Sequence, residues 1–376
     1  MTTEPDIREA LARAAAELPQ DVERRLDELH RGMPRRDRVR RIGVIAVAAV
    51  VAVSAVAVVS SIRPSGDGAR IGGSTPTGRI ALTRVLVDTN GGESADIVAL
   101  DAGSGSLTPV SEGPSIDFFP VWSPDGTHVA FGTGTDSGGD SAIRVANADG
   151  SDPVTIDSGK VEFLSWSPDG TRLAYIHSQA GSVDDAPDGI YVVGADGSGA
   201  HRVLPGSWQS VSWSPDGALL LLAGWPTNTE HACPPDCTQV YTVGLDGSGL
   251  TPLTDGARYA HYAAWSPDGS RIAFVTSAEY DNVDYGSDVF VMNADGGHQT
   301  RLTGWAGFDS FPVWSPDGAF LAFASDRGVT AAQAAANADG AFSYIGIYVM
   351  APDGSEVRRI VPGEDHVALL PSSWTP

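Results

Sequence analysis

Aromatic and imidazole side chains gather in the segments that connect the apolar runs of this sequence. They are Phe118, Trp208, Tyr259, His261, Trp305, Phe308 and His366, with Phe119 and Tyr262 beside two of them. Large rings on connecting segments above a rigid scaffold are typical of a binding surface. We therefore predict a binding face made of these residues, and the alternative for each ring is that it caps the core beneath.

Acidic side chains form a second group with possible chemistry. The segments GSVDDAPDG at 181–189 and YDNVDYGSD at 280–288 each crowd several carboxylates together. Such clusters suit Ca²⁺, which takes about six to eight oxygen ligands. Neither segment has the ligand spacing of the D-x-D-x-D-G calcium loop. We therefore expect a solvated acidic face and no cofactor, with Ca²⁺ as the alternative.

The two cysteines, Cys233 and Cys237, lie in the short segment HACPPDC. Outside the cytoplasm, a local disulfide is the first expectation for such a pair. A metal site that includes His231 is the alternative, but three or four ligands at a recognisable spacing are missing. The cysteines are therefore predicted as a disulfide candidate, and no metal site is predicted.

Catalytic motifs do not occur in the sequence. It has no G-x-S-x-G nucleophile segment, no P-loop and no G-x-G-x-x-G dinucleotide signature after a strand. The formal net charge of −23 also argues against nucleic acid as a partner, because phosphate contacts require a basic surface. We expect a protein that binds its partner rather than an enzyme.

An internal repeat indicates how these residues are positioned. The motif W-S-P-D-G begins at Trp122, Trp166, Trp213, Trp265 and Trp314, and its copies lie 44 to 52 residues apart. This period suits a four-stranded propeller blade. The copies are followed by apolar runs such as RLAYI at 172–176 and IYVV at 190–193, bounded by Gly, Pro and Asp as strands are.

Within the motif, Pro, Asp and Gly suit a hairpin turn, and the Trp is large enough to fill the wedge between neighbouring blades. We predict that these residues are structural and that none is catalytic. They are Trp122, Asp125, Gly126, Trp166, Asp169, Gly170, Trp213, Asp216, Gly217, Trp265, Asp268, Gly269, Trp314, Asp317, Gly318 and, at the end of the repeat, Trp374.

The two ends of the repeat predict its closure. Residues 79–87, 96–100 and 107–110 match the second, third and fourth strands of a blade, and 368–374 match a first strand. Joining them completes a blade and removes the exposed edges of an open arrangement. The predicted fold class is therefore all-β, a six-bladed β-propeller of four-stranded blades over residues 79–376, with its sixth blade closed by N- and C-terminal strands.

The repeat resembles that of the TolB-like, WD-like propeller family, whose pattern is W-S-P-D-G, L-A-F, I-Y-V-M, D-G and L-T. The copies WSPDGSRIAFVTS at 265–277 and WSPDGAFLAFASDRG at 314–328 are nearest to this pattern. The resemblance implies the propeller fold. It does not name a function, because the family includes a periplasmic translocation-associated protein, propeller domains of serine peptidases and sugar-acid lyases.

The N-terminal part of the sequence predicts a membrane anchor. Residues 42–62 carry no charge and, as a helix, match the roughly 30 Å hydrocarbon core of a bilayer. Arginines cluster directly before this segment, so the positive-inside rule places residues 1–41 in the cytoplasm. A cleaved signal peptide is the alternative, but it would have an unusually long charged region. Residues 63–78 are rich in Gly, Ser, Pro and Thr and are predicted to be a flexible linker.

Together these features predict a bacterial single-pass cell-membrane protein with a monomeric propeller outside the cytoplasm. The propeller is expected to bind a protein or a cell-envelope polymer through its variable connecting segments. Two other functions stay open. One is transmembrane signalling, in which ligand capture changes what the cytoplasmic helices bind. The other is a metal-dependent lyase that acts on acidic sugars, as in the lyase branch of the family.

Overall fold

The computed structural model describes the propeller part of the chain. It covers residues 75–87, 93–113, 115–134, 141–159, 161–177, 188–226, 238–256, 259–277, 286–304, 307–328, 345–362 and 367–376. The predicted cytoplasmic segment 1–41, membrane helix 42–62 and most of the linker 63–78 lie outside these ranges, so they stay predictions. Among the described residues, no helix is long and apolar enough to span a membrane.

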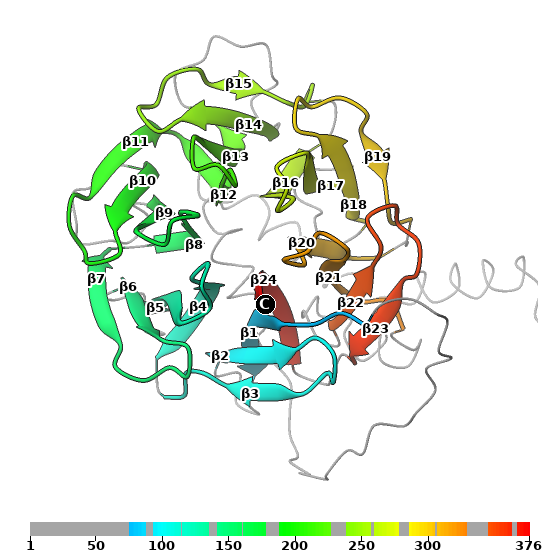
Figure 1. The fold of residues 1–376 in the computed structure, drawn as a ribbon, viewed down its shortest axis with the longest axis horizontal. Coiled ribbons are helices and arrows are strands. Elements are labelled where there is room, and N and C mark those ends of the chain that lie inside the picture. The colour runs from blue at the N-terminus through cyan, green and yellow to red at the C-terminus, as the bar shows by residue number, and fades with distance from the viewer. Residues whose placement is uncertain are drawn as a thin grey trace, which may run out of the picture. The chain divides into compact units, whose positions relative to one another are not determined.

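The described chain forms six four-stranded antiparallel sheets arranged in a ring (Figure 1). Each sheet is one blade, and its strands follow one another from the centre of the ring to its rim. Blade 1 has β4 (Ile116–Trp122), β5 (His128–Gly134), β6 (Ala142–Asn147) and β7 (Val154–Ser158). Blade 2 has β8 (Val161–Trp166), β9 (Arg172–His177), β10 (Gly189–Gly194) and β11 (His201–Pro205).

The next two blades repeat this order. Blade 3 has β12 (Ser207–Trp213), β13 (Leu219–Trp225), β14 (Gln239–Gly244) and β15 (Thr251–Pro252). Blade 4 has β16 (Tyr259–Trp265), β17 (Arg271–Ser277), β18 (Asp288–Asn293) and β19 (Thr300–Arg301). The predicted runs 172–176 and 190–193 lie within β9 and β10, which confirms the strand assignment there.

Blades 5 and 6 complete the ring. Blade 5 has β20 (Asp309–Trp314), β21 (Leu321–Ser325), β22 (Gly346–Met350) and β23 (Arg358–Val361). Blade 6 has β24 (Val367–Thr375), β1 (Arg79–Val87), β2 (Glu93–Asp101) and β3 (Leu107–Pro109). The last strand of the chain is therefore the innermost strand of the blade that the first strands form. This confirms the predicted six blades and the closure by both ends of the repeat.

The closing pair, β24 and β1, is antiparallel and extends along almost the whole of both strands. Ile80 lies opposite Trp374, and Val85 lies opposite Ala368. Around this pair, the side chains of Ile80 and Trp374 belong to one core cluster with Val313 of blade 5. The closure therefore buries apolar surface against the neighbouring blade as well as pairing two strands.

Each W-S-P-D-G motif forms the turn between the first and second strands of its blade. In blade 1, the Ser123 hydroxyl donates a hydrogen bond to Oδ1 of Asp125 at 2.6 Å and accepts one from the backbone N–H of His128 at 2.9 Å. Gly126 has a φ of 67°, which a residue with a side chain rarely adopts. The same Ser-to-Asp bond, also at 2.6 Å, recurs in Ser167–Asp169, Ser214–Asp216, Ser266–Asp268 and Ser315–Asp317.

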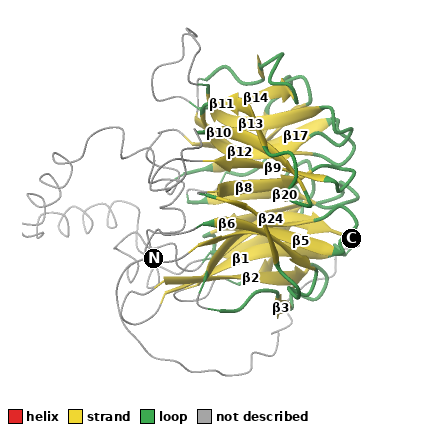
Figure 2. Cartoon of the chain, turned by 90° about the vertical axis from the view of Figure 1, so that its left-hand side faces the viewer, coloured by secondary structure: helices red, strands yellow, loops and turns green. Residues whose placement is uncertain are grey.

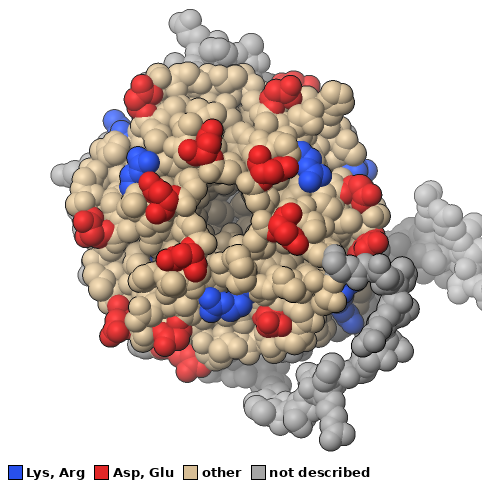
Figure 3. Space-filling view, viewed as in Figure 1, with Lys and Arg blue, Asp and Glu red and all other residues tan. Residues whose placement is uncertain are grey.

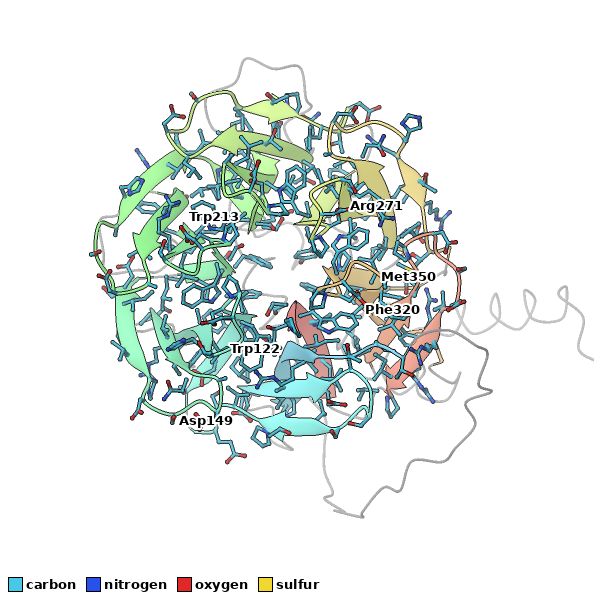
Figure 4. The ribbon with its side chains drawn as sticks, in the orientation of Figure 1. Trp122, Asp149, Trp213, Arg271, Phe320 and Met350 are labelled. Atoms are coloured by element: carbon cyan, nitrogen blue, oxygen red, sulfur yellow. The ribbon has the colours of Figure 1, made fainter. Side chains whose placement is uncertain are left out.

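The motif tryptophans lie between blades. The indole N–H of Trp166 donates to the Val121 carbonyl of the preceding blade at 3.0 Å, and that of Trp314 donates to the Ala264 carbonyl at 3.3 Å. Trp122 and Trp213 lie towards the inner part of the propeller (Figure 4), and each is covered by a guanidinium group of the preceding blade. Arginine carbons lie 4.7 to 4.8 Å from the ring centroids in Arg79–Trp122, Arg172–Trp213 and Arg271–Trp314, which is cation–π geometry.

A buried side chain of the closing strand should contribute more to the free energy of unfolding than an exposed apolar side chain at the rim. We expect Trp374→Ala to lower the free energy of unfolding by about 3–5 kcal/mol, as for other large buried side chains, because it also loosens the closed ring. Val154 at the rim is 61% exposed, so Val154→Ala should change the same quantity by less than about 0.5 kcal/mol. Urea unfolding of both variants measures this, and equal losses would contradict the proposed importance of closure.

Acid should remove stabilisation that the turn carboxylates provide. The Ser123 hydroxyl, and after it the Thr127 backbone N–H, lower the pKa of Asp125 from 3.8 to about 2. Equivalent bonds lower the pKa of Asp169 and that of Asp268 to about 2. Because these folded-state values lie below the unfolded ones, the stabilisation is complete above about pH 4 and is lost as the pH falls towards about 2.

The variant D125N/D169N/D268N should therefore show a shallower fall in the free energy of unfolding between about pH 4 and pH 2 than the parent chain. Urea unfolding at a series of pH values measures the slope. Glu112→Gln removes an exposed carboxylate outside the turns and serves as the control. The turn carboxylates would be irrelevant to acid stability if the triple variant kept the parent slope.

Candidate functional site

The strand order gives the propeller two different faces. The W-S-P-D-G turns and the turns between third and fourth strands lie on one face, which we call the turn face. The connections between second and third strands and those between blades lie on the other, which we call the variable face. Strands run between the two faces, and the C-terminus lies on the turn face because β24 ends there (Figure 2).

The turn face is acidic around its centre. The turn carboxylates follow the innermost strands, so they encircle the axis of the ring; they are Asp125, Asp169, Asp216, Asp268 and Asp317. Figure 3 shows this face, with acidic groups around a central hollow. These carboxylates are engaged by the Ser hydroxyls of their own turns, so the arrangement is explained by hairpin formation.

The structure places the predicted binding residues differently from the sequence interpretation. Phe118 lies in β4, Trp208 in β12, and Tyr259 and His261 in β16, so they belong to inner strands and not to loops. The expectation of loop positions was wrong because the inner strands begin up to six residues before the motif Trp. The side chain of Phe118 and that of Tyr259 are half-buried.

Trp208 packs into the interior. It is 4% exposed, and its ring meets that of Tyr241 edge-on at 5.8 Å between centroids. Phe308, directly before β20, is also buried, and its backbone N–H donates to the Asp326 carboxylate at 2.9 Å. These two rings therefore cap the core, in agreement with the alternative interpretation. Further predicted positions lie outside the described residues, namely Trp305, His366, Cys233, Cys237 and most of both acidic segments.

Four aromatic rings meet at the axis of the propeller, and we call them the channel stack. They are Phe119, Phe163, Tyr262 and Phe311 of blades 1, 2, 4 and 5. Phe119 stacks on Phe163 at 4.2 Å, and Tyr262 lies 4.2 Å from Phe311. Phe163 and Tyr262 come from blades that are not neighbours, yet their centroids are 5.7 Å apart. The stack therefore reaches across the axis of the ring.

The backbone of the channel stack is strained. The φ angles of Phe119, Phe163, Tyr262 and Phe311 are 51°, 46°, 49° and 55°. Each residue lies in a β-bulge of its inner strand, where the pairing with the second strand shifts. Left-handed conformations are uncommon for bulky residues and cost about 1–3 kcal/mol each. Such strain, repeated in four blades, favours a functional role for the rings that it turns towards the axis.

Sequence reasoning missed Phe163 and Phe311, although a signal was present. All four stack residues stand three positions before the motif Trp, as Phe163 does before Trp166. In blades 3 and 6 this position holds Ser210 and Pro371. An alignment of the five motif copies at this offset would have shown the aromatic column.

A buried histidine lies beside the channel stack. His261 is 3% exposed, and its ring centroid is 6.0 Å from that of Tyr262. Its Nδ1 contacts the amide oxygen of Gln209 in the neighbouring blade, while its Nε2 is buried and has no hydrogen-bond partner among the described residues. Burial lowers the pKa of His261 to about 4, so the ring is neutral near neutral pH.

A buried ion pair holds the strand that carries Phe311. Asp309, at the start of β20, is 0% exposed, accepts a hydrogen bond from Ser325 at 2.6 Å and pairs with Arg327. Burial raises the pKa of Asp309, although Ser325 and Arg327 act in the opposite direction. The guanidinium of Arg327 also lies 5.0 Å from the ring centroid of Phe323. This network fixes the end of the strand where the channel stack begins.

The described residues hold no group of three or more His, Cys, Asp or Glu side chains that is placed to bind a metal ion. Residues 181–187 and 280–285 of the predicted Ca²⁺ alternative lie outside the described ranges. The groups that the structure places at the axis are the rings of the channel stack and the buried imidazole of His261 beside them.

The imidazole of His261 should stay unprotonated until strongly acidic pH. We expect its NMR titration to have a midpoint near pH 4, with the resonance assigned from its loss in His261→Asn. Because the unfolded chain binds this proton more tightly, the group destabilises the fold as the pH falls from 6.5 towards 4. A midpoint near 6.5 would show that the ring is accessible to water.

The fold is similar to solved propellers. The crystal structure of TolB from Acinetobacter baumannii matches with a TM-score of 0.62 and 18% identity, over 81% of this chain and 68% of that chain. A putative TolB from Agrobacterium tumefaciens matches with a TM-score of 0.53 and 20% identity, over 80% of this chain and 99% of that chain.

A chain in the crystal structure of the nidogen/laminin complex matches with a TM-score of 0.55 and 14% identity, over 79% of this chain and 98% of that chain. No protein-family model and no curated protein matches the chain. Sequence identities of this size show a shared fold and do not indicate a shared function. The chain therefore has the six-bladed β-propeller fold of the TolB structures.

Proposed function

We propose that this chain is a non-catalytic binding module, and that its propeller captures a protein through the variable face. The observation that carries the proposal is the channel stack, whose bulky residues are held in left-handed conformations in four blades. Packing alone does not require this conformation, since blades 3 and 6 close the ring with Ser210 and Pro371 at the same position. The strain orients aromatic rings at the axis, where several blades can contact one ligand.

The position of these residues supports binding at the variable face. The inner strands of blades 1 to 5 begin at that face and run to their W-S-P-D-G turns, and Phe163 lies in the first half of β8 while Tyr262 lies at the middle of β16. Both rings are only half-buried, whereas the neighbouring Phe119 and Phe311 are buried. Two partly accessible aromatic rings are a suitable anchor for a partner side chain.

The comparisons are consistent with a protein as the partner. One matched chain belongs to the nidogen/laminin complex, which is an assembly of two proteins. A cell-envelope polymer is a second type of ligand for the same face. Charge does favour a protein with basic groups, because the chain carries a formal net charge of −23.

The proposed setting is the outer side of the cell membrane. Its support is the uncharged segment 42–62 and the arginines before it, which favour a single helix in the membrane and residues 63–376 outside the cytoplasm. The propeller closes its own ring, so it needs no second copy to cover a sheet edge, and we propose that it acts as a monomer.

Site-specific photo-crosslinking in living cells tests the binding face. Benzoylphenylalanine in place of half-buried Tyr259, at the variable end of β16, should give a discrete adduct with one partner. The same group in place of Val154, an exposed rim residue just after a turn on the turn face, is the matched control. Equal adduct patterns from the two positions, or none from Tyr259, would contradict binding through the variable face.

A further inference from the structure

We propose that the junction of Asp295 and Gly296 is a site of spontaneous covalent modification, at which the aspartate converts to isoaspartate. Asp-Gly sequences are prone to this reaction because glycine has no side chain to hinder its own backbone nitrogen. The propeller repeats the D-G sequence in its hairpin turns. The turn of Asp295, between β18 and β19, differs from the others in one hydrogen bond, and this difference determines its reactivity.

The reaction joins two groups of the same turn. The backbone nitrogen of Gly296 attacks the Cγ carbon of the Asp295 side chain, and an N–Cγ bond forms. The nitrogen loses its proton and the carboxylic acid loses its hydroxyl, and these leave together as water. The product is a cyclic imide. Water then opens the imide at either carbonyl, which restores aspartate or leaves the chain connected through the side chain as isoaspartate.

A serine hydroxyl restrains the carboxyl group in the equivalent turns of other blades. In the turn after β6, Ser151 donates to Oδ1 of Asp149 from its hydroxyl at 2.6 Å and from its backbone N–H at 3.0 Å. The same two bonds recur in Ser248–Asp246 and Ser355–Asp353. The serine that follows the D-G sequence therefore holds the carboxylate of its own turn.

This hydroxyl makes the carboxyl group less reactive. It is the main cause that lowers the pKa of Asp149, of Asp246 and of Asp353 below the ordinary value. An ionised carboxylate has no hydroxyl to release as water, so a carboxyl group that stays ionised forms the imide slowly. The bond also fixes the side chain in the turn, which restricts the movement of Cγ towards the glycine nitrogen.

Asp295 lacks this restraint. The residue after its glycine is Gly297, which has no hydroxyl, and the carboxylate accepts a hydrogen bond from the Gly297 backbone N–H at 2.9 Å. In the W-S-P-D-G turns, the serine before the proline supplies the hydroxyl, as Ser266 does to Asp268 at 2.6 Å. Among the D-G hairpin turns that the structure describes, Asp295 is therefore the one whose carboxylate receives no side-chain hydroxyl.

The attacking nitrogen is held alike in these turns. The N–H of Gly296 donates to the Asn293 carbonyl at 2.9 Å, and that of Gly247 donates to the Gly244 carbonyl at 2.9 Å. Asp295 is exposed, so water can reach the imide. Two consecutive glycines also give this turn more backbone freedom than a glycine followed by serine. The difference in reactivity therefore arises from the missing hydroxyl and from this freedom.

Modification at Asp295 should affect the contact between blades 3 and 4, because isoaspartate adds one methylene to the backbone of the turn. Gly296 packs closely on blade 3, and a Cβ built on it would lie 2.5 Å from the Leu253 carbonyl oxygen. The Gly296 carbonyl also accepts a hydrogen bond from the Gln299 side chain at 3.2 Å. A longer backbone cannot keep both contacts, so the aged protein should be less stable.

Ageing of the full-length chain, purified in detergent, tests the proposal. Isoaspartate is quantified by enzymatic methylation with an isoaspartyl methyltransferase. It is located by fragmentation of proteolytic peptides at their N–Cα bonds, which distinguishes isoaspartate from aspartate. In the parent chain, isoaspartate should accumulate about tenfold faster at Asp295 than at Asp246, because Asp295 lacks the hydrogen bond that the serine hydroxyl gives to Asp246.

Two reciprocal variants connect the rate to the hydroxyl. Gly297→Ser supplies it to Asp295, and we expect a rate about tenfold lower there. Gly297 lacks the left-handed backbone of Gly296, whose φ is 84°, and a Cβ built on Gly297 lies 3.1 Å from the Asp295 carboxylate, so a small movement of that side chain accommodates serine. Ser248→Gly removes the hydroxyl from Asp246 and should raise the rate there about tenfold. Thermal unfolding of the fresh variants checks their folding.

Equal rates at Asp295 and Asp246 in the parent chain would overturn the proposal. An unchanged rate at Asp295 in Gly297→Ser, or at Asp246 in Ser248→Gly, would show that the hydroxyl is not the restraint and would also overturn it. Ageing should lower the urea stability of the parent chain more than that of Gly297→Ser, and equal losses would contradict the effect on blade packing. These measurements need no partner, so their outcome is separate from that of the proposed binding function.

Discussion

The pairing of β24 with β1 is the interaction on which the whole propeller depends. A blade buries both of its faces against its neighbours, as the wholly buried pattern of β21 and β22 shows, so no blade has a stable surface by itself. Nearest-neighbour packing becomes complete only when blade 6 is built from both ends of the repeat. The register of Ile80 with Trp374 then determines how blade 6 meets blades 1 and 5.

The W-S-P-D-G motif has two parts with different roles, a polar turn that stabilises its own hairpin and a Trp that contacts the preceding blade. The Ser hydroxyl of each turn satisfies both an Asp carboxylate and a backbone N–H, so the hairpin needs no partner outside itself. The Trp, in contrast, works between blades, and Trp166 bonds to a carbonyl of the preceding one. Within one motif, the Ser and Asp therefore stabilise the local hairpin, and the Trp next to them stabilises the contact between blades.

The site at the axis has a different physical basis. Its residues lower the stability of the fold in two ways. Four bulky aromatic residues have left-handed backbone conformations, and His261 has a buried ring nitrogen without a hydrogen-bond partner among the described residues. Rigid surroundings must support such a cost, and the Asp309–Arg327 pair shows how the fold anchors one of the strands concerned. Strain of this kind at functional sites holds side chains in the orientation that a ligand requires before the ligand binds.

The sequence by itself determined the architecture, because strand runs, hairpin turns and a fixed period are local properties that five motif copies repeat. It also showed that the sixth blade must be shared by both ends of the repeat. Only the tertiary structure decided which aromatic residues face the axis. Trp208 and Phe163 both lie in inner strands with a bulge, yet Phe163 meets Tyr262 of a blade that is not its neighbour while Trp208 packs against Tyr241. A bulge reverses the direction of a side chain without any change in composition, so its effect appears only once strands are paired.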